Sequence, residues 1–418
     1  MNFNGLINSG NLNKISSVMK RALNGEDILT VFLGGSITQG SLSSTPELCY
    51  AYRVYRWWCE KFPMAKISFF NAGIGGTTSQ FGVARVEDHV LSKKPDFLLT
   101  EFAVNDEADE FFKETYEGLI RRILKADPAP ALLLMNNAWF DTGRSAERVH
   151  LEIAQYYDLP MVSMRSTVFD AISKGEFKPS DLSPDMLHPN DAGHELIAKV
   201  IINTLEMVYE SVCTGTSEGM REGICTGAPE EVHKRVCGGI CGDINECMNE
   251  RANDGLAENI SLMPALTKNG YENTTRIKSY NMNDYCVIFE GFKKDEREKK
   301  EFLDIFSGGF IGNKVGDCIY FVVNCKNLAI QYKKTVNRPA LIASAVIDYD
   351  EENKIILDAN FDEDWGDCLY IETIAKDLVP GEHRVKITIE DIPSKTTNKE
   401  ESGADVSPFY LVSVIAGK

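Results

Sequence analysis

The order of apolar and polar positions divides the chain into two regions with different periodicities. From about residue 11 to residue 210, short apolar runs alternate with stretches of helical spacing, which is typical of βαβ units and a parallel sheet. Five runs are too continuously apolar to alternate and are predicted to be strands buried on both faces: 28–35, 66–73, 96–104, 131–138 and 160–164. Amphipathic helices are expected between or after them at 50–62, 80–92, 111–126, 145–157 and 191–209. We therefore predict a three-layer, flavodoxin-like α/β domain with a five-stranded parallel sheet of strand order 2-1-3-4-5.

The second region has a different pattern. Residues 211–262 are rich in Gly, Ser, Cys and charge and poor in periodic apolar positions, which predicts a linker or a long excursion. After it, short segments such as CIYFVVNC, HRVKITIE and FYLVSVIAG recur between turn signals such as FSGGF and VPGEH, which predicts an all-β, jelly-roll-like sandwich. The charge run KKDEREKK at 293–300 is interpreted as a solvated loop. The predicted domains are thus 1–210 and 263–418, joined by 211–262.

Composition excludes several classes of function. The chain has 44 Lys and Arg against 62 Asp and Glu, a net charge of −18, and no segregated basic patch, so neither nucleic acid nor an anionic membrane is an expected partner. No apolar run approaches the roughly 18 residues of a membrane span, and the first residues do not have the pattern of an export signal. Eleven cysteines are an odd number for a disulfide framework and favour reduced thiols. We expect a cytoplasmic protein, with an exported protein as the open alternative, and leave open whether it forms a homo-oligomer.

Three predicted strands deliver glycine or polar groups to one edge of the sheet. The first ends in GGSITQG, which places Ser36 where the strand turns; the second ends in NAGIGGTT and the third in EFAVND. Open α/β folds place their sites at this edge. A serine esterase needs donors around a developing oxyanion, and the backbone N–H groups of Ser36 and Gly76 with the side-chain amide of Asn105 would supply three. Taken alone, Asn105 is equally a turn-forming residue.

A possible acid–base pair follows in DLSPDMLHPNDAGHELIAKV, just before the last helix of the first region. Asp185 and His188 are three residues apart in a loop, a spacing that lets the carboxylate accept from Nδ1 while Nε2 faces a nucleophile. His194, His89 and His150 are interpreted as satisfied structural histidines.

Other polar features of the chain have structural interpretations. Asp191 is expected to cap the last helix, with Asn190 as the competing candidate. Trp139 follows the fourth strand, where it would either overlook the site or pack in the core. A phosphate-binding turn is disfavoured because GGSITQG lacks the lysine of GxxxxGK[ST], and GxGxxG is not matched either.

The cysteines of the excursion do not form a recognisable metal site. Cys225, Cys237, Cys241 and Cys247, with His233, lack the CxxC pairs of zinc sites. We therefore expect no metal, and the serine chemistry needs no cofactor.

Together these blocks resemble the SGNH, or GDSL-type, hydrolase family over about the first 210 residues. The resemblance implies Ser36 as nucleophile, Gly76 and Asn105 as oxyanion donors beside the Ser36 N–H, and Asp185 and His188 as the other triad members. Two departures are visible: the family's GDS reads GGS, with Gly35 in place of the aspartate, and GxND reads AVND. Gly35 and Trp139 are the candidate substrate-binding residues.

A hydrolase domain of this type followed by a β-sandwich is similar to bacterial carbohydrate O-acetyl esterases, in which the sandwich resembles a carbohydrate-binding module. The resemblance implies a carboxylic ester hydrolase that deacetylates oligosaccharides derived from xylan or mannan. The alternatives are a lipase or thioesterase acting on longer acyl chains, and a catalytically inactive scaffold for a sugar-binding sandwich. Trp365, Tyr370 and Tyr285 of the sandwich are aromatic candidates for sugar contact, although packing roles are expected for them.

Overall fold

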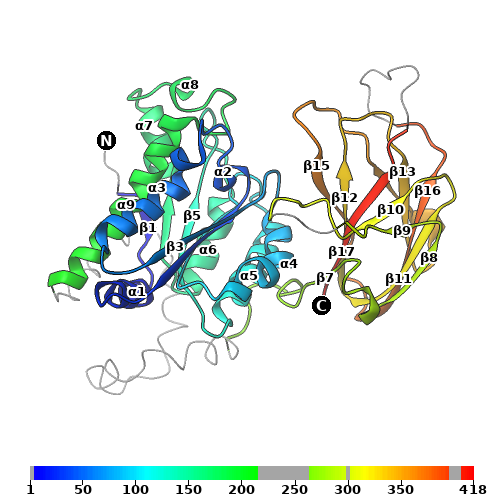
Figure 1. The fold of residues 1–418 in the computed structure, drawn as a ribbon, viewed down its shortest axis with the longest axis horizontal. Helices are drawn as coiled ribbons and strands as arrows, with labels where there is room; N and C mark the ends of the chain where they lie inside the picture. The colour runs from blue at the N-terminus through cyan, green and yellow to red at the C-terminus, as the bar shows by residue number, and fades with distance from the viewer. Residues whose placement is uncertain (1–3, 215–262, 298–301, 395–405) are drawn as a thin grey trace. The chain divides into compact units, whose positions relative to one another are not determined.

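The computed structural model describes residues 4–214, 263–297, 302–394 and 406–418 (Figure 1). Its contacts divide the chain into two compact units. The first comprises residues 1–73, 88–113 and 120–267; the second comprises 74–87, 114–119 and 268–418. Two short stretches inside the predicted first domain are thus grouped with the second unit. The predicted boundary at residue 210 falls inside a helix that continues to Thr214.

The N-terminal part contains a six-stranded sheet in the order β1-β6-β5-β4-β2-β3. Its strands are β1 (Leu6–Asn8), β2 (Ile28–Gly34), β3 (Ile67–Gly73), β4 (Phe97–Glu101), β5 (Ala131–Asn136) and β6 (Met161–Ser163). The pairs among β2 to β6 are parallel, which confirms the predicted strand order. The strand β1 was not expected. It has three residues and joins the edge of the sheet antiparallel to β6, and so short a segment has no periodicity to detect.

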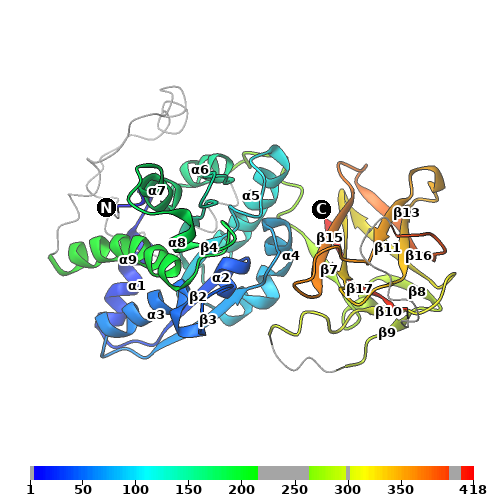
Figure 2. The same cartoon turned by 90° about the horizontal axis from the view of Figure 1, so that it is seen from above.

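Helices cover this sheet, as expected for a parallel sheet whose strands are apolar on both sides. They are α1 (Asn13–Leu23), α2 (Ser36–Gln39), α3 (Tyr50–Lys61), α4 (Ser79–His89), α5 (Glu110–Leu124), α6 (Glu147–Tyr156), α7 (Asp170–Ser173), α8 (Pro179–Leu182) and α9 (Asp191–Thr214). In Figures 1 and 2, α1, α3 and α9 lie together on one face and α6 lies on the other. The core on the first face joins Val54 and Trp58 of α3 to Ile197 and Ile201 of α9. Among the described residues, no helix combines the length and apolar character needed to cross a membrane.

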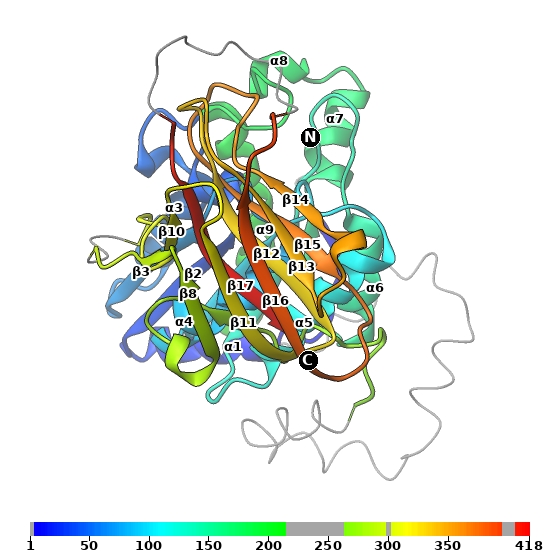
Figure 3. The same ribbon diagram turned by 90° about the vertical axis from the view of Figure 1, so that its right-hand side faces the viewer.

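The C-terminal part is a sandwich of two antiparallel sheets around one core. One sheet has the order β15-β12-β17-β10-β9 with β7 paired to β17, and the other has the order β14-β13-β16-β11-β8, whose central strands run side by side in Figure 3. The bounds are β7 Thr275–Ile277, β8 Cys286–Glu290, β9 Lys293–Lys294, β10 Phe310–Gly312, β11 Cys318–Cys325, β12 Asn327–Lys334, β13 Ile342–Ile347, β14 Ile355–Asp358, β15 Cys368–Ala375, β16 Gly381–Glu390 and β17 Phe409–Gly417. Val385, Ile387 and Ile389 alternate with more exposed residues along β16, so one face of that strand enters the core.

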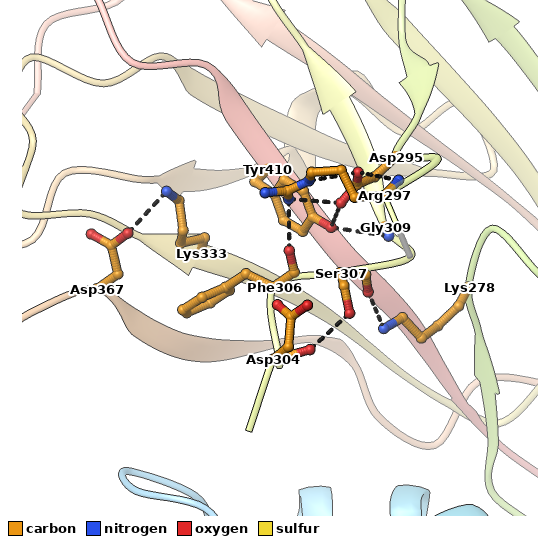
Figure 4. A network of polar contacts seen from close by, with 10 residues as sticks. All are labelled: Lys278, Asp295, Arg297, Asp304, Phe306, Ser307, Gly309, Lys333, Asp367 and Tyr410. Atoms are coloured by element: carbon orange, nitrogen blue, oxygen red, sulfur yellow. Dashed lines mark hydrogen bonds and ion pairs between the residues drawn. The ribbon is translucent and has the colours of Figure 1, made fainter. Parts of the chain in front are cut away.

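The interpretation of 293–300 as a solvated loop is wrong for 293–295, whereas Glu296 and Arg297 are exposed and lie outside any strand; 298–300 lie outside the described residues. Lys293 and Lys294 form β9, and the Asp295 side chain is 2% exposed. Arg297 donates to both Asp295 carboxylate oxygens at 2.8 and 2.7 Å, and the Tyr410 hydroxyl donates to one of them (Figure 4). The hydrogen bonds from Arg297 are the main cause that lowers the pKa of Asp295 to about 2. Burial of this carboxylate is tolerated because it is paired and hydrogen-bonded.

Candidate active site

The nucleophile candidate lies where three parallel strands end together. Gly34, the last residue of β2, is in register with Gly73 of β3 and Glu101 of β4. A Cβ atom at Gly34 would lie 2.1 Å from Thr38 Oγ1 and 2.7 Å from the Glu101 carbonyl oxygen, so the close approach requires glycine. The helix α2 begins two residues later at Ser36. The strand therefore turns sharply and places Ser36 at the carboxyl edge of the sheet.

Ser36 is 7% exposed and lies in the first turn of α2, directly after Gly35. The carbonyl of Gly35 accepts the first hydrogen bond of this short helix, from Gln39 N at 3.0 Å. Gly40 ends the helix with φ +103°, a conformation that favours glycine. Glycine on both sides thus holds the serine on a single helical turn. The substrate-binding role expected for Gly35 stays a prediction.

A chain of hydrogen bonds joins Ser36, His188 and Asp185. Ser36 Oγ lies 2.8 Å from His188 Nε2, and His188 Nδ1 lies 2.7 Å from Asp185 Oδ2. Geometry of this kind lets an imidazole take a proton from the hydroxyl while the carboxylate fixes the ring's tautomer. The structure therefore brings together the three residues that the sequence predicts as a triad, from segments 152 positions apart.

The Asp185 carboxylate is held by its own loop. Its Oδ1 accepts from the backbone N–H groups of His188 at 2.7 Å and Leu187 at 3.0 Å, and from Ser183 Oγ at 3.2 Å. Partial burial raises the pKa of Asp185, but the hydrogen bonds from the His188 ring and from the two backbone groups outweigh it, and the net pKa lies below the ordinary value. Asp185 is therefore ionised at neutral pH, as an acceptor for His188 must be. Ser183 was not singled out from the sequence, although a serine two residues before the aspartate is a common local donor.

The two further oxyanion-donor candidates, Asn105 and Gly76, lie just beyond the ends of two different strands. Asn105 lies in the turn after β4, where its backbone N–H donates to Phe102 O at 3.1 Å. Its Oδ1 is buried and makes no hydrogen bond within the described part of the chain. Gly76 lies beyond the end of β3 with φ +67°, a conformation that favours glycine, in the stretch that groups with the second unit. Their roles as donors stay predictions.

Trp139 is half-buried and packs against the core of the first unit. Its indole Nε1 is buried and has no hydrogen-bond partner among the described residues, while the Arg144 guanidinium lies 5.7 Å from its ring centre. Its chain neighbour Phe140 donates a backbone hydrogen bond to Met186 O at 2.8 Å, in the loop that carries the triad pair. Trp139 thus follows β5 next to that loop, and its contact with substrate stays a prediction.

Sequence reasoning missed the carboxyl group of Glu101, at the end of β4. Its side chain is fully buried, and burial raises the pKa of Glu101 to about 8, with the nearby Asp106 charge adding to the shift. Its Oε1 accepts from Ala103 N at 3.1 Å. Glu101 is therefore predominantly neutral at pH 7. The only sequence signal was a single acidic residue at the end of an apolar strand.

The polar residues around α9 correct one expectation and confirm another. Asn190, and not Asp191, caps the helix, because Asn190 Oδ1 accepts from Ala192 N and Gly193 N. Asp191 instead accepts from Ser44 N at 2.8 Å and Ser44 Oγ at 2.7 Å. His194 is buried, accepts from Tyr50 N at 3.3 Å and lies 3.3 Å from Ser41 O, which confirms it as a satisfied structural histidine.

Two further expectations concern residues away from this edge. Trp365 was expected to pack, but it is 61% exposed and contacts Phe361 edge-to-face at 5.0 Å. Tyr370, in contrast, packs against Tyr332. The cysteines at 225–247 and His233 lie outside the described residues. Within the described residues, no group of three or more His, Cys, Asp or Glu side chains is arranged to hold a metal ion.

Comparison with known proteins extends these observations. The GDSL-like Lipase/Acylhydrolase family matches residues 32–196. The thioesterase 1/protease 1/lysophospholipase L1 of Escherichia coli strain K12 is 26% identical over 183 residues, which cover 42% of this chain and 82% of that protein. An acetylxylan esterase of Geobacillus stearothermophilus is 24% identical over 165 residues, 34% of this chain and 74% of that protein.

A solved structure resembles the whole chain. It is a two-domain esterase active on acetylated mannans, co-crystallised with mannopentaose; it is 39% identical, has a TM-score of 0.82, and the match covers 99% of this chain and 97% of that one. A second structure of a two-domain esterase active on acetylated mannans matches with 40% identity and a TM-score of 0.81 over 99% and 98%. Because the similarity includes both domains and the family match spans Ser36, Asp185 and His188, the chain belongs to the GDSL-like lipase/acylhydrolase family and is a carboxylic ester hydrolase.

Proposed function

We propose that the protein is a serine esterase that removes O-acetyl groups from carbohydrates, with oligosaccharides derived from mannan or xylan as substrates. The observation that carries the proposal is the likeness of 99% of the chain, sandwich included, to the two-domain esterase active on acetylated mannans. The acetylxylan esterase relative supports the same class over the first region alone. The hydrogen-bonded Ser36, His188 and Asp185 supply the chemistry.

The proposed reaction proceeds through an acetyl-enzyme. His188 Nε2 takes the proton of Ser36 Oγ as this oxygen attacks the acetyl carbonyl, and Asp185 stabilises the imidazolium that forms. The N–H groups of Ser36 and Gly76 and the Asn105 amide would hold the tetrahedral oxyanion. The bond between the acetyl carbon and the sugar oxygen then breaks, and His188 donates the proton to that departing oxygen, which leaves as the sugar hydroxyl. Water, deprotonated by His188, then attacks the acetyl carbonyl. The bond to Ser36 Oγ breaks, His188 returns the proton to Oγ, and acetate is released.

A preference for longer acyl chains is the alternative, and it has one observation in its favour. The Escherichia coli relative carries the names thioesterase and lysophospholipase, but its similarity covers 42% of this chain. The mannan esterase similarity covers more than twice that share and includes the sandwich. The carbohydrate proposal therefore has the broader support.

A substrate panel tests the proposal. Acetate release is measured from acetylated manno- and xylo-oligosaccharides, and cleavage is measured for p-nitrophenyl esters from acetyl to palmitoyl. We expect acetate release from the oligosaccharides and a rate on p-nitrophenyl esters that falls as the acyl chain lengthens. Rapid cleavage of long-chain esters without acetate release from any oligosaccharide would instead assign the protein to the lipase or thioesterase class.

A cytoplasmic location, where imported oligosaccharides would be the substrate, is part of the same proposal. It is supported by the composition alone: eleven cysteines, an odd number, favour a reducing compartment. Fractionation of the source cells, with acetyl esterase activity followed in each fraction, would test it.

A further inference from the structure

The segment that follows β5 is hydrogen-bonded to the turn that carries Asn105. The Ala146 backbone N–H, just before α6, donates to Ala103 O at 2.7 Å. From the first turn of α6, the Arg148 guanidinium donates to Ala108 O at 2.8 Å. These bonds hold the turn on both sides of Asn105, at positions 103 and 108.

A buried histidine with a side-chain contact on each ring nitrogen lies between these two backbone contacts. His150, on α6, is fully buried, and its Nε2 lies 3.1 Å from Asp106 Oδ2. Its Nδ1 lies 3.0 Å from Asn136 Oδ1, at the end of β5. Asp106 is 3% exposed and directly follows Asn105 in the chain. The imidazole thus links the last residue of a core strand to the residue next to the oxyanion-donor candidate.

Burial makes the hydrogen bond between His150 and Asp106 costly to break. A carboxylate removed from water must keep its hydrogen-bond partners, because leaving it unpaired costs more than the hydrogen bond itself contributes. The hydrogen bond with His150 therefore contributes to fixing the position of Asp106. The backbone N–H groups of Asn105 and Asp106 both donate to Phe102 O, at 3.1 and 3.0 Å, so the two residues belong to one tight turn. A displacement of Asp106 would move the Asn105 side chain with it.

The Asn105 amide, by contrast, is not oriented through its own oxygen. Asn105 Oδ1 has no hydrogen-bond partner among the described residues. Its direction is accordingly set by the backbone of the turn, which the neighbouring Asp106 and His150 hold. Catalytic donors must be placed to within a fraction of an ångström, because a displacement of about 1 Å costs on the order of a hundredfold in rate.

We propose that His150 is a positioning residue for the oxyanion donor: through Asp106 it fixes the turn that aims the Asn105 amide. The inference rests on the proposed function, in which Asn105 stabilises the oxyanion. In this proposal, His150 acts on the barrier through Asn105.

A double-mutant cycle tests the proposal. His150→Gln, Asn105→Ala and the double variant are compared in p-nitrophenyl acetate hydrolysis, with kcat referred to folded enzyme by circular dichroism and thermal unfolding. We expect His150→Gln to lower kcat roughly tenfold with KM little changed, because the oxyanion contact forms only in the transition state. In the Asn105→Ala background the same substitution should lower kcat less than about twofold, since its target is gone.

Two further variants separate positioning from stability. His383 is a matched buried histidine in the second unit, with Nδ1 2.7 Å from Asp348 Oδ2, so His383→Gln should lower the melting temperature without lowering kcat. If His150→Gln does not fold, the pair Asp106→Asn and Asp106→Ala replaces it. The asparagine keeps an oxygen for His150 and should retain most of the activity that the alanine variant loses.

The outcomes are distinct. Equal losses from His150→Gln in both backgrounds, or an unchanged kcat in the single variant, would overturn the positioning role. An unchanged kcat in Asn105→Ala alone would overturn the oxyanion assignment of the proposed function, and the positioning role with it. A loss in Asn105→Ala that His150→Gln reproduces only while Asn105 is present would support both.

Discussion

The substitution Asn105→Ala should lower kcat strongly while changing the free energy of unfolding little. The substitution removes one of three proposed donors and leaves the N–H groups of Ser36 and Gly76 in place. Loss of one such donor raises the activation barrier by about 3 kcal/mol, which corresponds to roughly a hundredfold lower kcat.

The structure indicates that the fold will tolerate this change. Asn105 Oδ1 makes no hydrogen bond among the described residues, and the backbone bond from Asn105 N to Phe102 O does not depend on the side chain. The free energy of unfolding should therefore fall by about 1 kcal/mol or less. Asn281 offers the opposite case: it accepts from Lys278 N at 2.8 Å and donates to Arg276 O at 2.9 Å, so Asn281→Ala should lower stability and leave kcat unchanged.

The assay is steady-state hydrolysis of p-nitrophenyl acetate, with active sites counted by a serine-directed inhibitor and stability measured by urea unfolding. Asn105→Asp serves as a second arm, because a carboxylate beside the developing oxyanion repels it and should slow turnover at least as much as alanine does. Wild-type kcat in folded Asn105→Ala would refute the reasoning and remove this residue from the site.

Two further predictions concern carboxylates. Asp185→Asn should lower kcat by roughly a hundredfold to a thousandfold, less than in a buried triad, because the 46% exposed Asp185 side chain lets water assist His188; wild-type turnover in that variant would contradict the triad. Because the pKa of Asp295 is lowered in the fold to about 2, its ionised form stabilises the protein above about pH 4, and this contribution of about 2 kcal/mol is lost as the pH falls towards 2. Thermal unfolding of Asp295→Asn should accordingly show a lower melting temperature at pH 7 and a weaker decline between pH 4 and pH 2; the wild-type slope would speak against it.

The parts of the fold and site that were predictable from sequence are those encoded locally. Continuous apolar runs such as 131–138 identify buried strands, because both faces of a parallel sheet are covered. Asp185 and His188 are three residues apart, and Ser36 follows two glycines, so each half of the triad is visible in a short window. The meeting of the two halves follows from the rule that the carboxyl ends of parallel strands share one edge.

The parts that escaped prediction depend on partners distant in the chain. A charge run gives no sign that Asp295 will meet Tyr410, which lies 115 positions away, so the run was interpreted as a solvated loop. His150 and Asp106 are 44 positions apart, and neither segment alone indicates the pair. Asn190 and Asp191 are both good helix caps by residue type, and only the contact of Asp191 with Ser44 decides between them. Tertiary context determines all three.

The most direct test of the central claim is the initial rate of acetate release from acetylated manno-oligosaccharides by the wild-type protein and by Ser36→Ala, prepared and assayed side by side. If Ser36 carries the acetyl group, the wild-type protein releases acetate and the variant, folded with an unchanged circular dichroism spectrum, is slower by about a thousandfold or more. Comparable release by both proteins would contradict the serine mechanism, and release by neither would contradict the assignment to acetylated mannans.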